Sequence, residues 1–218
     1  MALVMYDLDG TLLETAGEIA QAVNLTLEEF NHGSVSQEQV RSWIGHGTGW
    51  LMKTAWQHTQ GPDVEPWDDV MARFIHHYEA TAGTTSTVFP HVFETLQKAR
   101  DYGVKQAIVT NKERRFTDRI LEKHGLQNAF ELVICGDSLA VKKPNPAVID
   151  HCLATLGATH GESLFIGDSE IDVSTAKAAG VVCWAVPYGY NMGRPIADAM
   201  PDRIVPDIRE VPNYFRHL

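Results

Sequence analysis

Four short polar clusters, each following an apolar run, constrain the fold of this chain more than any other feature. The clusters are residues 7–11 (Asp-Leu-Asp-Gly-Thr), 110–112 (Thr-Asn-Lys), 143–144 (Lys-Pro) and 167–172 (Gly-Asp-Ser-Glu-Ile-Asp). Short apolar runs between turn signals are typical of buried strands. Because the carboxyl ends of parallel strands lie along one edge of a sheet, these clusters are expected to meet in one crevice.

The crevice would hold several carboxylates together with a hydroxyl, an amide and an ammonium group. Carboxylates crowded into one place raise one another's pKa unless a cation lies among them. Oxygen ligands suit a hard ion such as Mg²⁺. The sequence therefore predicts a site for phosphate chemistry that uses a divalent cation.

Five apolar runs predict the strands of a parallel sheet, at spacings that leave room for helices. The runs are residues 2–6, 106–109, 132–135, 163–166 and 182–186. Such alternation indicates a sheet covered by helices on both faces. Four glycines stand where helices are expected to end in left-handed caps: Gly103, Gly125, Gly157 and Gly180. We predict an α/β fold with a Rossmann-like parallel-sheet core.

Between the first two runs, roughly residues 15–85 show helical periodicity and no convincing strand. Thr15 with Glu18, and Ser36 with Gln39, have the spacing of capping boxes ahead of apolar positions. We predict a helical cap at residues 15–85, inserted into a discontinuous catalytic core formed by residues 1–14 and 86–218.

Composition excludes some classes of partner. The net charge of −10 over 218 residues argues against nucleic acid, because that affinity rests mainly on Lys and Arg contacts. The three cysteines lie in apolar stretches without Cys-x-x-Cys spacing, which favours buried free thiols and a reducing compartment. No stretch approaches membrane-spanning length, and the first apolar run is too short for a signal peptide. We expect a cytoplasmic enzyme, monomeric or homodimeric, with no membrane partner.

The order of the four clusters carries a family resemblance. Asp-x-Asp-Gly-Thr, Thr-Asn, Lys-Pro and Gly-Asp-Ser-x-x-Asp resemble the four signatures of the haloacid dehalogenase superfamily. The resemblance covers nearly the whole chain, and the helical insertion resembles that superfamily's mobile cap. Segments 109–112 and 188–196 are similar, more narrowly, to phosphoglycolate phosphatases. The chain departs from this narrower pattern at Glu14-Thr15, where Asp-Ser is common, and at His91, where Gly is usual.

The first cluster supplies two candidate catalytic carboxylates. Asp7 is the candidate nucleophile, because in-line attack of a carboxylate on phosphorus splits hydrolysis into formation and breakdown of an aspartyl-phosphate. Asp9 is the candidate acid/base, which protonates the leaving alcohol and later takes a proton from water. A single Asp pair at a strand end could equally form a turn with local hydrogen bonds, and the three later clusters favour catalysis.

The second and third clusters are expected to bind the phosphoryl group. Thr110 and Asn111 can donate hydrogen bonds to phosphoryl oxygens, aided by backbone amides at the start of the following helix. Lys143 can neutralise the transferring group and the nucleophile. Its neighbour Lys142 is the competing candidate, but the Lys-Pro pair fits the family pattern. Lys112 resembles the usual residue after Thr-Asn and is expected to be a surface or cap-facing charge.

The resemblance implies a Mg²⁺ site at the fourth cluster. Asp168 would bind the ion together with the Asp7 carboxylate and the backbone carbonyl of Asp9. Asp172 would act through a bound water, and the alternative of direct coordination stays open. Mg²⁺ commonly keeps several waters and takes few protein oxygens, as this ligand set requires.

Substrate choice is expected to depend on the cap, because the core clusters handle only the phosphoryl group. The glycine-rich turn containing Gly45, His46 and Gly47 could lay backbone amides over a small anionic substrate, or could be a plain interhelical turn. Arg41 and His46 are nearby candidates for binding a substrate carboxylate.

Three functions are compatible with these residues. The first is a Mg²⁺-dependent phosphatase for a small phosphorylated metabolite, with 2-phosphoglycolate as the best candidate and other sugar or amino-sugar phosphates open. The second is a relative with different chemistry, either a dehalogenase, which would not need Asp9 or the metal site, or a phosphomutase. The third is a non-catalytic binding protein, which the full set of turnover residues disfavours.

Overall fold

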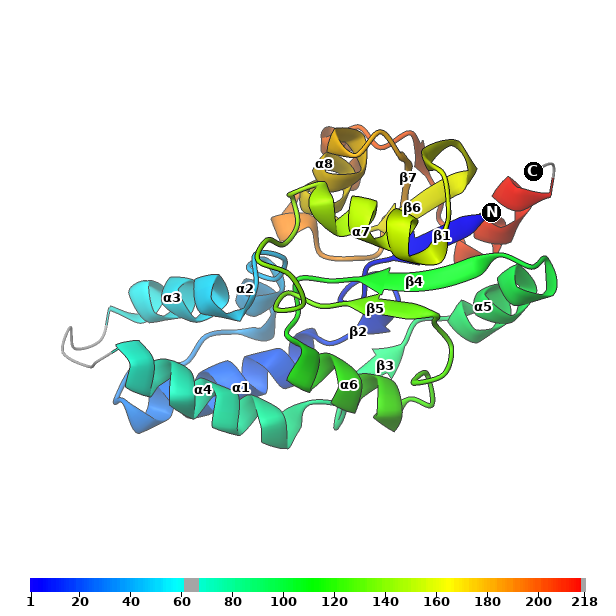
Figure 1. Ribbon diagram of the computed structural model, residues 1–218. Helices are drawn as coiled ribbons and strands as arrows, with labels where there is room; N and C mark the ends of the chain where they lie inside the picture. The colour runs from blue at the N-terminus through cyan, green and yellow to red at the C-terminus, as the bar shows by residue number, and fades with distance from the viewer. Residues whose placement is uncertain (61–66, 217–218) are drawn as a thin grey trace.

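The computed structural model describes residues 1–60 and 67–216 and contains a six-stranded parallel sheet (Figure 1). In spatial order the strands are β5 (Leu132–Ile134), β4 (Lys105–Val109), β1 (Leu3–Tyr6), β6 (Ser163–Gly167), β7 (Val182–Ala185) and β8 (Arg203–Ile204). The α/β fold and all five predicted strands are confirmed. The sixth strand, β8, was not predicted, because this short edge strand is exposed and shows no apolar run.

Side chains of the central strand alternate between two hydrophobic clusters, one on each face of the sheet. Leu3 and Met5 pack with α7 (Ala147–Leu156) and α8 (Glu170–Ala178). Val4 and Tyr6 pack with the opposite layer, which contains α5 (Val92–Asp101), α6 (Arg114–Lys123) and the 3₁₀ segment η4 (Ile208–Phe215). Figure 1 shows these two helical layers on either side of the strands. A strand buried on both faces needs the continuous apolar run seen in β1.

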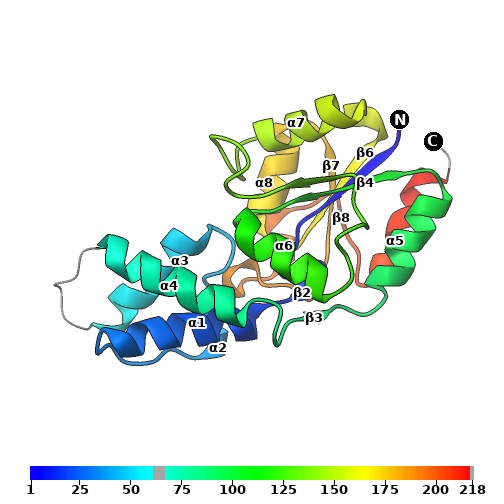
Figure 2. The same ribbon diagram turned by 60° about the horizontal axis from the view of Figure 1, so that its bottom comes forward.

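Four further helices gather beyond one end of the sheet. They are α1 (Ala16–Glu29), α2 (Gln37–Arg41), α3 (Thr48–Thr59) and α4 (Trp67–Thr81). Figures 1 and 2 show them together at the end toward which β4 points. The chain leaves and re-enters the core through a two-stranded antiparallel pair, β2 (Leu13–Glu14) and β3 (Thr87–Val88). This pair was not predicted, since two-residue strands leave no periodic signal. Residues 15–85 remain our proposed cap.

Only one of the two predicted capping boxes forms. Ser36 and Gln39 make the reciprocal bonds at the start of α2. Thr15 precedes α1, but its hydroxyl donates to Asp9 rather than to the helix. Glu18 accepts instead from the backbone amides of Gly83 and Ser86, where the chain returns to the core. The Thr15–Glu18 prediction is therefore wrong, because both side chains have tertiary partners that outcompete the local bond.

The remaining details agree with the sequence. The predicted helix-ending glycines all have positive φ, as left-handed caps require. Cys135, Cys152 and Cys183 are buried free thiols. Three short 3₁₀ segments lie in the connections around β6 and β7: η1 (His160–Glu162), η2 (Asn191–Gly193) and η3 (Ile196–Ala199). Among the helices described, none has the length and apolarity needed to cross a bilayer.

Candidate active site

The ends of the central strands bring the four sequence clusters to one cavity of about 50 Å³. Asp7 directly follows β1, and its amide donates to Ile166 at the end of β6 over 2.8 Å. Thr110 follows β4, and its amide donates to Ile134 at the end of β5 over 2.9 Å. Both residues line the cavity, as do Asp9 and Lys143. The predicted meeting at one sheet edge thus follows from the strand order.

Lys143 is the buried cation beside the candidate nucleophile. Its Nζ lies 2.8 Å from Asp7 Oδ1 and 2.6 Å from Asp172 Oδ1. Burial alone would lower the pKa of Lys143, but the carboxylates of Asp172 and Asp7 raise it above its ordinary value. Lys142 instead donates to the His46 carbonyl over 2.8 Å. The structure therefore places Lys143, and not Lys142, against the nucleophile.

Asp7 accepts no hydrogen bond from a backbone amide or hydroxyl among the described residues, and its cationic contact is Lys143, whose Nζ lies 2.8 Å from the buried Oδ1 atom. Burial raises the pKa of Asp7 to about 7, with Lys143 opposing the shift and Asp172 adding to it. Because Asp7 shares this ammonium with Asp172, a further positive charge nearby would stabilise the buried carboxylates.

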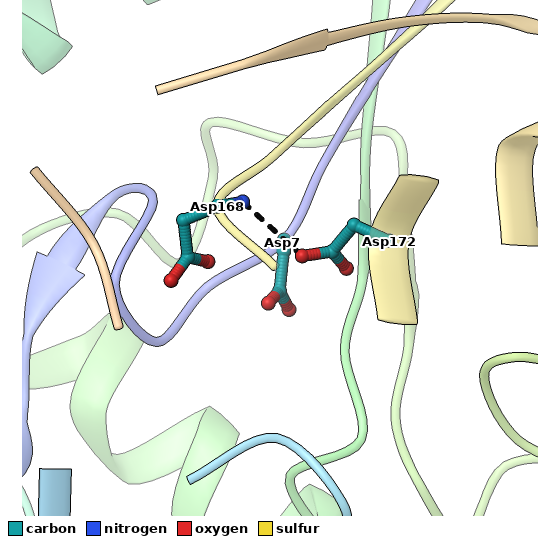
Figure 3. Close-up of side chains that lie close together, drawn as sticks. All are labelled: Asp7, Asp168 and Asp172. Carbon is teal, nitrogen blue, oxygen red and sulfur yellow. Dashed lines mark hydrogen bonds between the residues drawn. The ribbon is translucent and has the colours of Figure 1, made fainter. Parts of the chain in front are cut away.

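Asp168 and Asp172 follow β6 and face Asp7 (Figure 3). Asp168 Oδ1 accepts from the Thr11 hydroxyl over 2.9 Å, and its Oδ2 accepts from the Tyr190 amide over 2.6 Å. Burial raises the pKa of Asp168 well above its ordinary value, and the neighbouring carboxylates of Asp172 and Asp7 raise it further. These carboxyl groups are therefore costly to ionise together without an added cation.

The residues present fit a hard divalent ion. Asp7, Asp168 and Asp172 each offer a carboxylate oxygen within 4.8 Å of the others. Asp7 and Asp172 share the single ammonium of Lys143, so the three carboxylates carry more negative charge than this contact offsets, which favours a cation at this place. Since all three donors are oxygen atoms, Mg²⁺ suits the set better than a softer metal.

Asp172 is already engaged by protein donors. Its Oδ2 accepts from the amides of Asp168 and Ser169 and from the Ser169 hydroxyl, and its Oδ1 accepts from Lys143. Ser169 and Asp172 together form the capping box of α8. The bonds of this box hold Asp172 in place.

Asp9 is held by two side chains, one of which sequence reasoning misplaced. Lys112 Nζ lies 2.8 and 3.0 Å from the two carboxylate oxygens of Asp9, and Thr15 Oγ1 lies 2.6 Å from Oδ1. The Lys112 side chain is only 3% exposed. Of the two alternatives expected for Lys112, the surface charge is wrong, because the side chain is buried. The side chain instead faces Tyr78 of the proposed cap, whose ring centroid lies 4.9 Å from Nζ.

The two predicted phosphate-binding residues differ in their availability. Thr110 lines the cavity, and its hydroxyl oxygen accepts from the Lys112 amide over 3.2 Å, which leaves the hydroxyl hydrogen for a ligand. Asn111 also lines the cavity, but its amide group donates to the carbonyls of Gly45 and Lys143 and accepts from the Lys143 amide. In this conformation the Asn111 side chain joins the cap turn to the third cluster and does not offer the expected donors.

The glycine-rich turn reaches the cavity through its glycines. Gly45 and Gly47 line it. His46 is absent from the described lining residues, and its ring packs against Trp50 with centroids 4.8 Å apart. Burial, and secondarily Lys142, lower the pKa of His46. The structure therefore does not bring the His46 side chain to the expected position.

Arg41 faces away from the cavity and joins the cap to the core. Its guanidinium donates to Glu14 Oε2 and to the Tyr188 carbonyl, both over 2.9 Å. It also stacks on the ring of Tyr190, 4.8 Å from the centroid. The expectation that Arg41 binds substrate is wrong for this conformation, because Nη1 donates to Glu14 and Nη2 donates to the core loop.

Tyr190 is the main site residue that sequence reasoning missed. Its hydroxyl donates to Glu14 Oε1 over 2.7 Å and accepts from the Thr15 amide over 2.8 Å, while its own amide binds Asp168. The residue lies in the segment 188–196 that carries the narrower resemblance. A tyrosine in a loop has no sequence pattern that marks it as a site residue. The resemblance of segment 188–196 was therefore the one indication of its role.

Comparisons with known proteins agree with this geometry. The family model for haloacid dehalogenase-like hydrolases matches residues 4–186. The phosphoglycolate phosphatase of Pseudomonas syringae pv. syringae is 38% identical over 214 residues, which cover 96% of this chain and 78% of that protein. The phosphoglycolate phosphatase of Aliivibrio fischeri is 38% identical over 204 residues, covering 92% and 90%.

Solved structures show the same architecture. The crystal structure of a predicted phosphoglycolate phosphatase from Haemophilus somnus matches with a TM-score of 0.93 at 30% identity, covering 99% of this chain and 98% of that one. The structure of CbbY from Rhodobacter sphaeroides in complex with phosphate matches with a TM-score of 0.83 at 22% identity, covering 97% and 96%, and shares the fold. The superfamily resemblance seen in the four motifs is thus confirmed, and the chain belongs to the haloacid dehalogenase-like hydrolases.

Proposed function

We propose that this protein is a Mg²⁺-dependent phosphatase that hydrolyses a small phosphate monoester through an aspartyl-phosphate on Asp7. The best candidate reaction converts 2-phosphoglycolate to glycolate and phosphate. The observation that carries the proposal is the buried Asp7 carboxylate, whose Oδ1 lies 2.8 Å from Lys143 Nζ and which has carboxylate oxygens of Asp168 and Asp172 within 4.8 Å. A carboxylate that is flanked by a cation, and that accepts no backbone or hydroxyl hydrogen bond from the described residues, is suited to nucleophilic attack.

In the first half-reaction, Asp7 attacks phosphorus and forms a bond from its carboxylate oxygen. The bond between phosphorus and the ester oxygen breaks, and Asp9 gives a proton to that departing oxygen. Lys143 offsets negative charge on the nucleophile and the phosphoryl oxygens, because its Nζ already contacts Asp7. The Thr110 hydroxyl, which lines the cavity, is placed to donate to a phosphoryl oxygen.

In the second half-reaction, water attacks the phosphorus of the aspartyl-phosphate. Asp9 takes a proton from that water, and the bond from phosphorus to Asp7 breaks to release phosphate and restore the carboxylate. One group serves both steps because the proton given to the leaving alcohol is recovered from water. The fixed position of Asp9 between Lys112 and Thr15 supports this double use.

Asp7, Asp168 and the backbone carbonyl of Asp9 would hold the Mg²⁺ ion, with Asp172 contributing through a water. When bound, the ion supplies positive charge that lets the nucleophile and the phosphoryl group approach. Asp172 keeps Lys143 directed at the site through the 2.6 Å contact between Nζ and Oδ1. Thr11 and the Tyr190 amide fix the Asp168 carboxylate, so the ligand oxygens are oriented before binding.

The size and lining of the cavity support a small substrate. A volume of about 50 Å³ has room for only a few water-sized groups. The residues contributed by the proposed cap are apolar or uncharged and close the cavity above the carboxylates: Ile19, Ile44, Gly45, Gly47, Thr48, Leu51 and Tyr78. Such a cover excludes bulk water during turnover. The names of the relatives add support for 2-phosphoglycolate, and we propose a cytoplasmic location.

The proposal is tested by measuring phosphate release from a panel of small phosphate esters, with Mg²⁺ and with chelator. We expect 2-phosphoglycolate to be preferred and its hydrolysis to be lost with chelator. Preference for a sugar or amino-sugar phosphate would keep the phosphatase and replace the substrate. No release from any ester by folded, Mg²⁺-loaded protein would overturn the proposal in favour of a phosphomutase or a binding role.

A further inference from the structure

Lys112 is a buried cation whose one task in the proposed catalysis is to hold Asp9. It lines the cavity, its side chain is 3% exposed, and both hydrogen bonds of its Nζ go to the carboxylate of Asp9. An ammonium has three hydrogens, so these two bonds leave one for another acceptor. Burying a lysine is costly. The contacts with Asp9 and the Tyr78 ring, and the attraction to Glu18, offset part of that cost, and a further anion would offset more.

The other side of the cavity offers no cation. Every residue that the proposed cap contributes to the described lining is uncharged. Arg41 is bound to Glu14 and the core loop, and Lys142 is bound to the His46 carbonyl. Lys143, the second lysine of the lining, is shared between Asp7 and Asp172 and therefore serves the phosphoryl end.

Among the described lining residues, Lys112 is therefore the cation that can bind a second anionic group of the substrate. An unbalanced carboxylate in the cavity would face the carboxylates of Asp7, Asp9 and Asp168, and like charges at close range are strongly unfavourable. Lys112 contacts Asp9, which in the proposed reaction lies beside the ester oxygen. A carboxylate attached to the carbon that bears that oxygen would therefore lie near Nζ.

We propose that Lys112 binds the carboxylate of the substrate and selects phosphate esters of 2-hydroxy acids over uncharged analogues. This inference rests on the proposed phosphatase function and specifies its substrate class. It assigns to a residue of the second core cluster the recognition that the sequence suggested for the cap residues Arg41 and His46.

The test compares 2-phosphoglycolate with 2-hydroxyethyl phosphate, which carries an uncharged hydroxymethyl group in place of the carboxylate. The quantity measured is the ratio of kcat/KM for the two esters, with Mg²⁺, in wild type and in Lys112→Met. Both activities should fall, because Asp9 loses a partner. The ratio should fall by a further factor of about 10 to 100, the effect of losing a hydrogen bond to a charged group.

Lys112→Gln is the second variant. It removes the charge but keeps a donor for Asp9, so it protects folding and the position of the acid/base should Lys112→Met not fold. It should show the same loss of preference. Lys142→Met is the matched control, since Lys142 carries the same charge near the cavity but contacts only the cap turn. It should change both esters by the same factor.

The outcomes separate this inference from the proposed function. If both Lys112 variants lower the two activities equally, Lys112 only positions Asp9 and the inference is wrong. If wild type hydrolyses the uncharged ester as well as the carboxylate ester, the phosphatase stands and the inference is again wrong. If wild type hydrolyses neither ester nor any other in the panel, the proposed function itself fails, and the inference fails with it.

Discussion

Thr15 Oγ1 lies 2.6 Å from Asp9 Oδ1, although Thr15 opens the first helix of the proposed cap and Asp9 belongs to the core. The Thr15 amide is held in turn by the hydroxyl of Tyr190, which also binds Glu14. The position of the candidate acid/base therefore depends on how the chain enters the cap. The hydrogen bonds of Thr15 therefore both fix the start of the proposed cap and position the group proposed to transfer the proton.

Thr15→Val should lower kcat by about 10- to 100-fold, because Asp9 loses a hydrogen bond to its charged group while the side-chain volume is kept. KM should change little, since Thr15 is not a lining residue of the cavity. Steady-state kinetics with the preferred ester check this. Thr15→Ser keeps the hydroxyl and is the control, and an equal loss in both variants would show that the methyl packing matters instead.

Asp7→Asn should abolish turnover, by more than about 10³-fold, because an amide cannot form the aspartyl-phosphate. The fold should survive, since the substitution removes a buried carboxyl group whose pKa is raised by burial and keeps its shape. Acid-quenched wild type incubated with substrate should carry a phosphoryl group on the peptide that contains Asp7. Retention of substantial activity by a folded variant would contradict the nucleophile assignment.

Replacing Mg²⁺ by Ca²⁺ should inhibit the enzyme. The larger ion takes more ligands at longer distances, so it should misplace Asp7 relative to phosphorus even while it binds the same oxygens. Phosphate release is measured at fixed Mg²⁺ with increasing Ca²⁺, and recovery on adding excess Mg²⁺ is the control for denaturation. Full activity with Ca²⁺ alone would contradict the proposed role of the ion.

Features that depend on neighbours in the chain could be predicted from the sequence. β1 is a continuous apolar run because both of its faces are buried, and Asp7 follows it directly. The sequence therefore predicted both the first cluster and its place at the sheet edge. Lys143 follows the third run only after residues 136–142, so the Lys-Pro motif rather than direct adjacency identified it. Parallel pairing then brings these positions together, because the strand order puts β4 and β6 on either side of β1.

Features that depend on distant partners could not be predicted. Lys112 is buried because Tyr78 covers it, and nothing near Lys112 in the chain signals that contact. Arg41 has the charge expected of a carboxylate ligand, but its partners Glu14 and Tyr188 lie on the hinge and on a core loop. Asn111 likewise meets the Gly45 carbonyl across the boundary between core and cap. The sequence indicates the chemistry of these side chains, while the tertiary contacts decide where it is used.

Two carboxylates of α1 should respond to pH with opposite signs. Burial raises the pKa of Glu18 above 4.5, with Lys112 opposing the shift. A carboxyl group with a raised folded pKa stabilises the fold below its unfolded pKa and loses that contribution as pH rises through the folded value. Glu18→Gln removes this loss, so its melting temperature relative to wild type should be more favourable at about pH 7.5 than at about pH 4.

Glu29 provides the contrast. Its hydrogen bond with Arg73 lowers the pKa of Glu29 from 4.5 to about 2, so its contribution is present above the unfolded value and is lost as pH falls from 4.5 toward 2. Glu29→Gln should therefore be less stable than wild type at about pH 7.5, and the difference should shrink at about pH 3. Thermal melts of both variants check the pair. If the stability of Glu18→Gln relative to wild type falls as pH rises, as it should for Glu29→Gln, the assigned burial of Glu18 is contradicted.

Gly189→Ala should weaken metal binding, although the substitution replaces none of the proposed ligands. A Cβ atom at position 189 would overlap the Cβ atom and carboxylate of Asp168, which the next residue, Tyr190, holds through its amide over 2.6 Å. Either the loop or the carboxylate must move, and displacing a group that orients a ligand typically costs about 10- to 100-fold in metal affinity.

The measurement is the Mg²⁺ concentration that gives half-maximal phosphate release, which should rise by about tenfold or more in Gly189→Ala. Gly161→Ala is the matched control, because no atom lies within 4 Å of a Cβ atom built there, and its Mg²⁺ dependence should equal that of wild type. A lower maximal rate at an unchanged Mg²⁺ requirement would mean that the loop, rather than Asp168, yields. In that case Thr11 would hold Asp168 more firmly than Tyr190 does. The lower rate would then come from displacement of the core loop, which Arg41 contacts at the Tyr188 carbonyl.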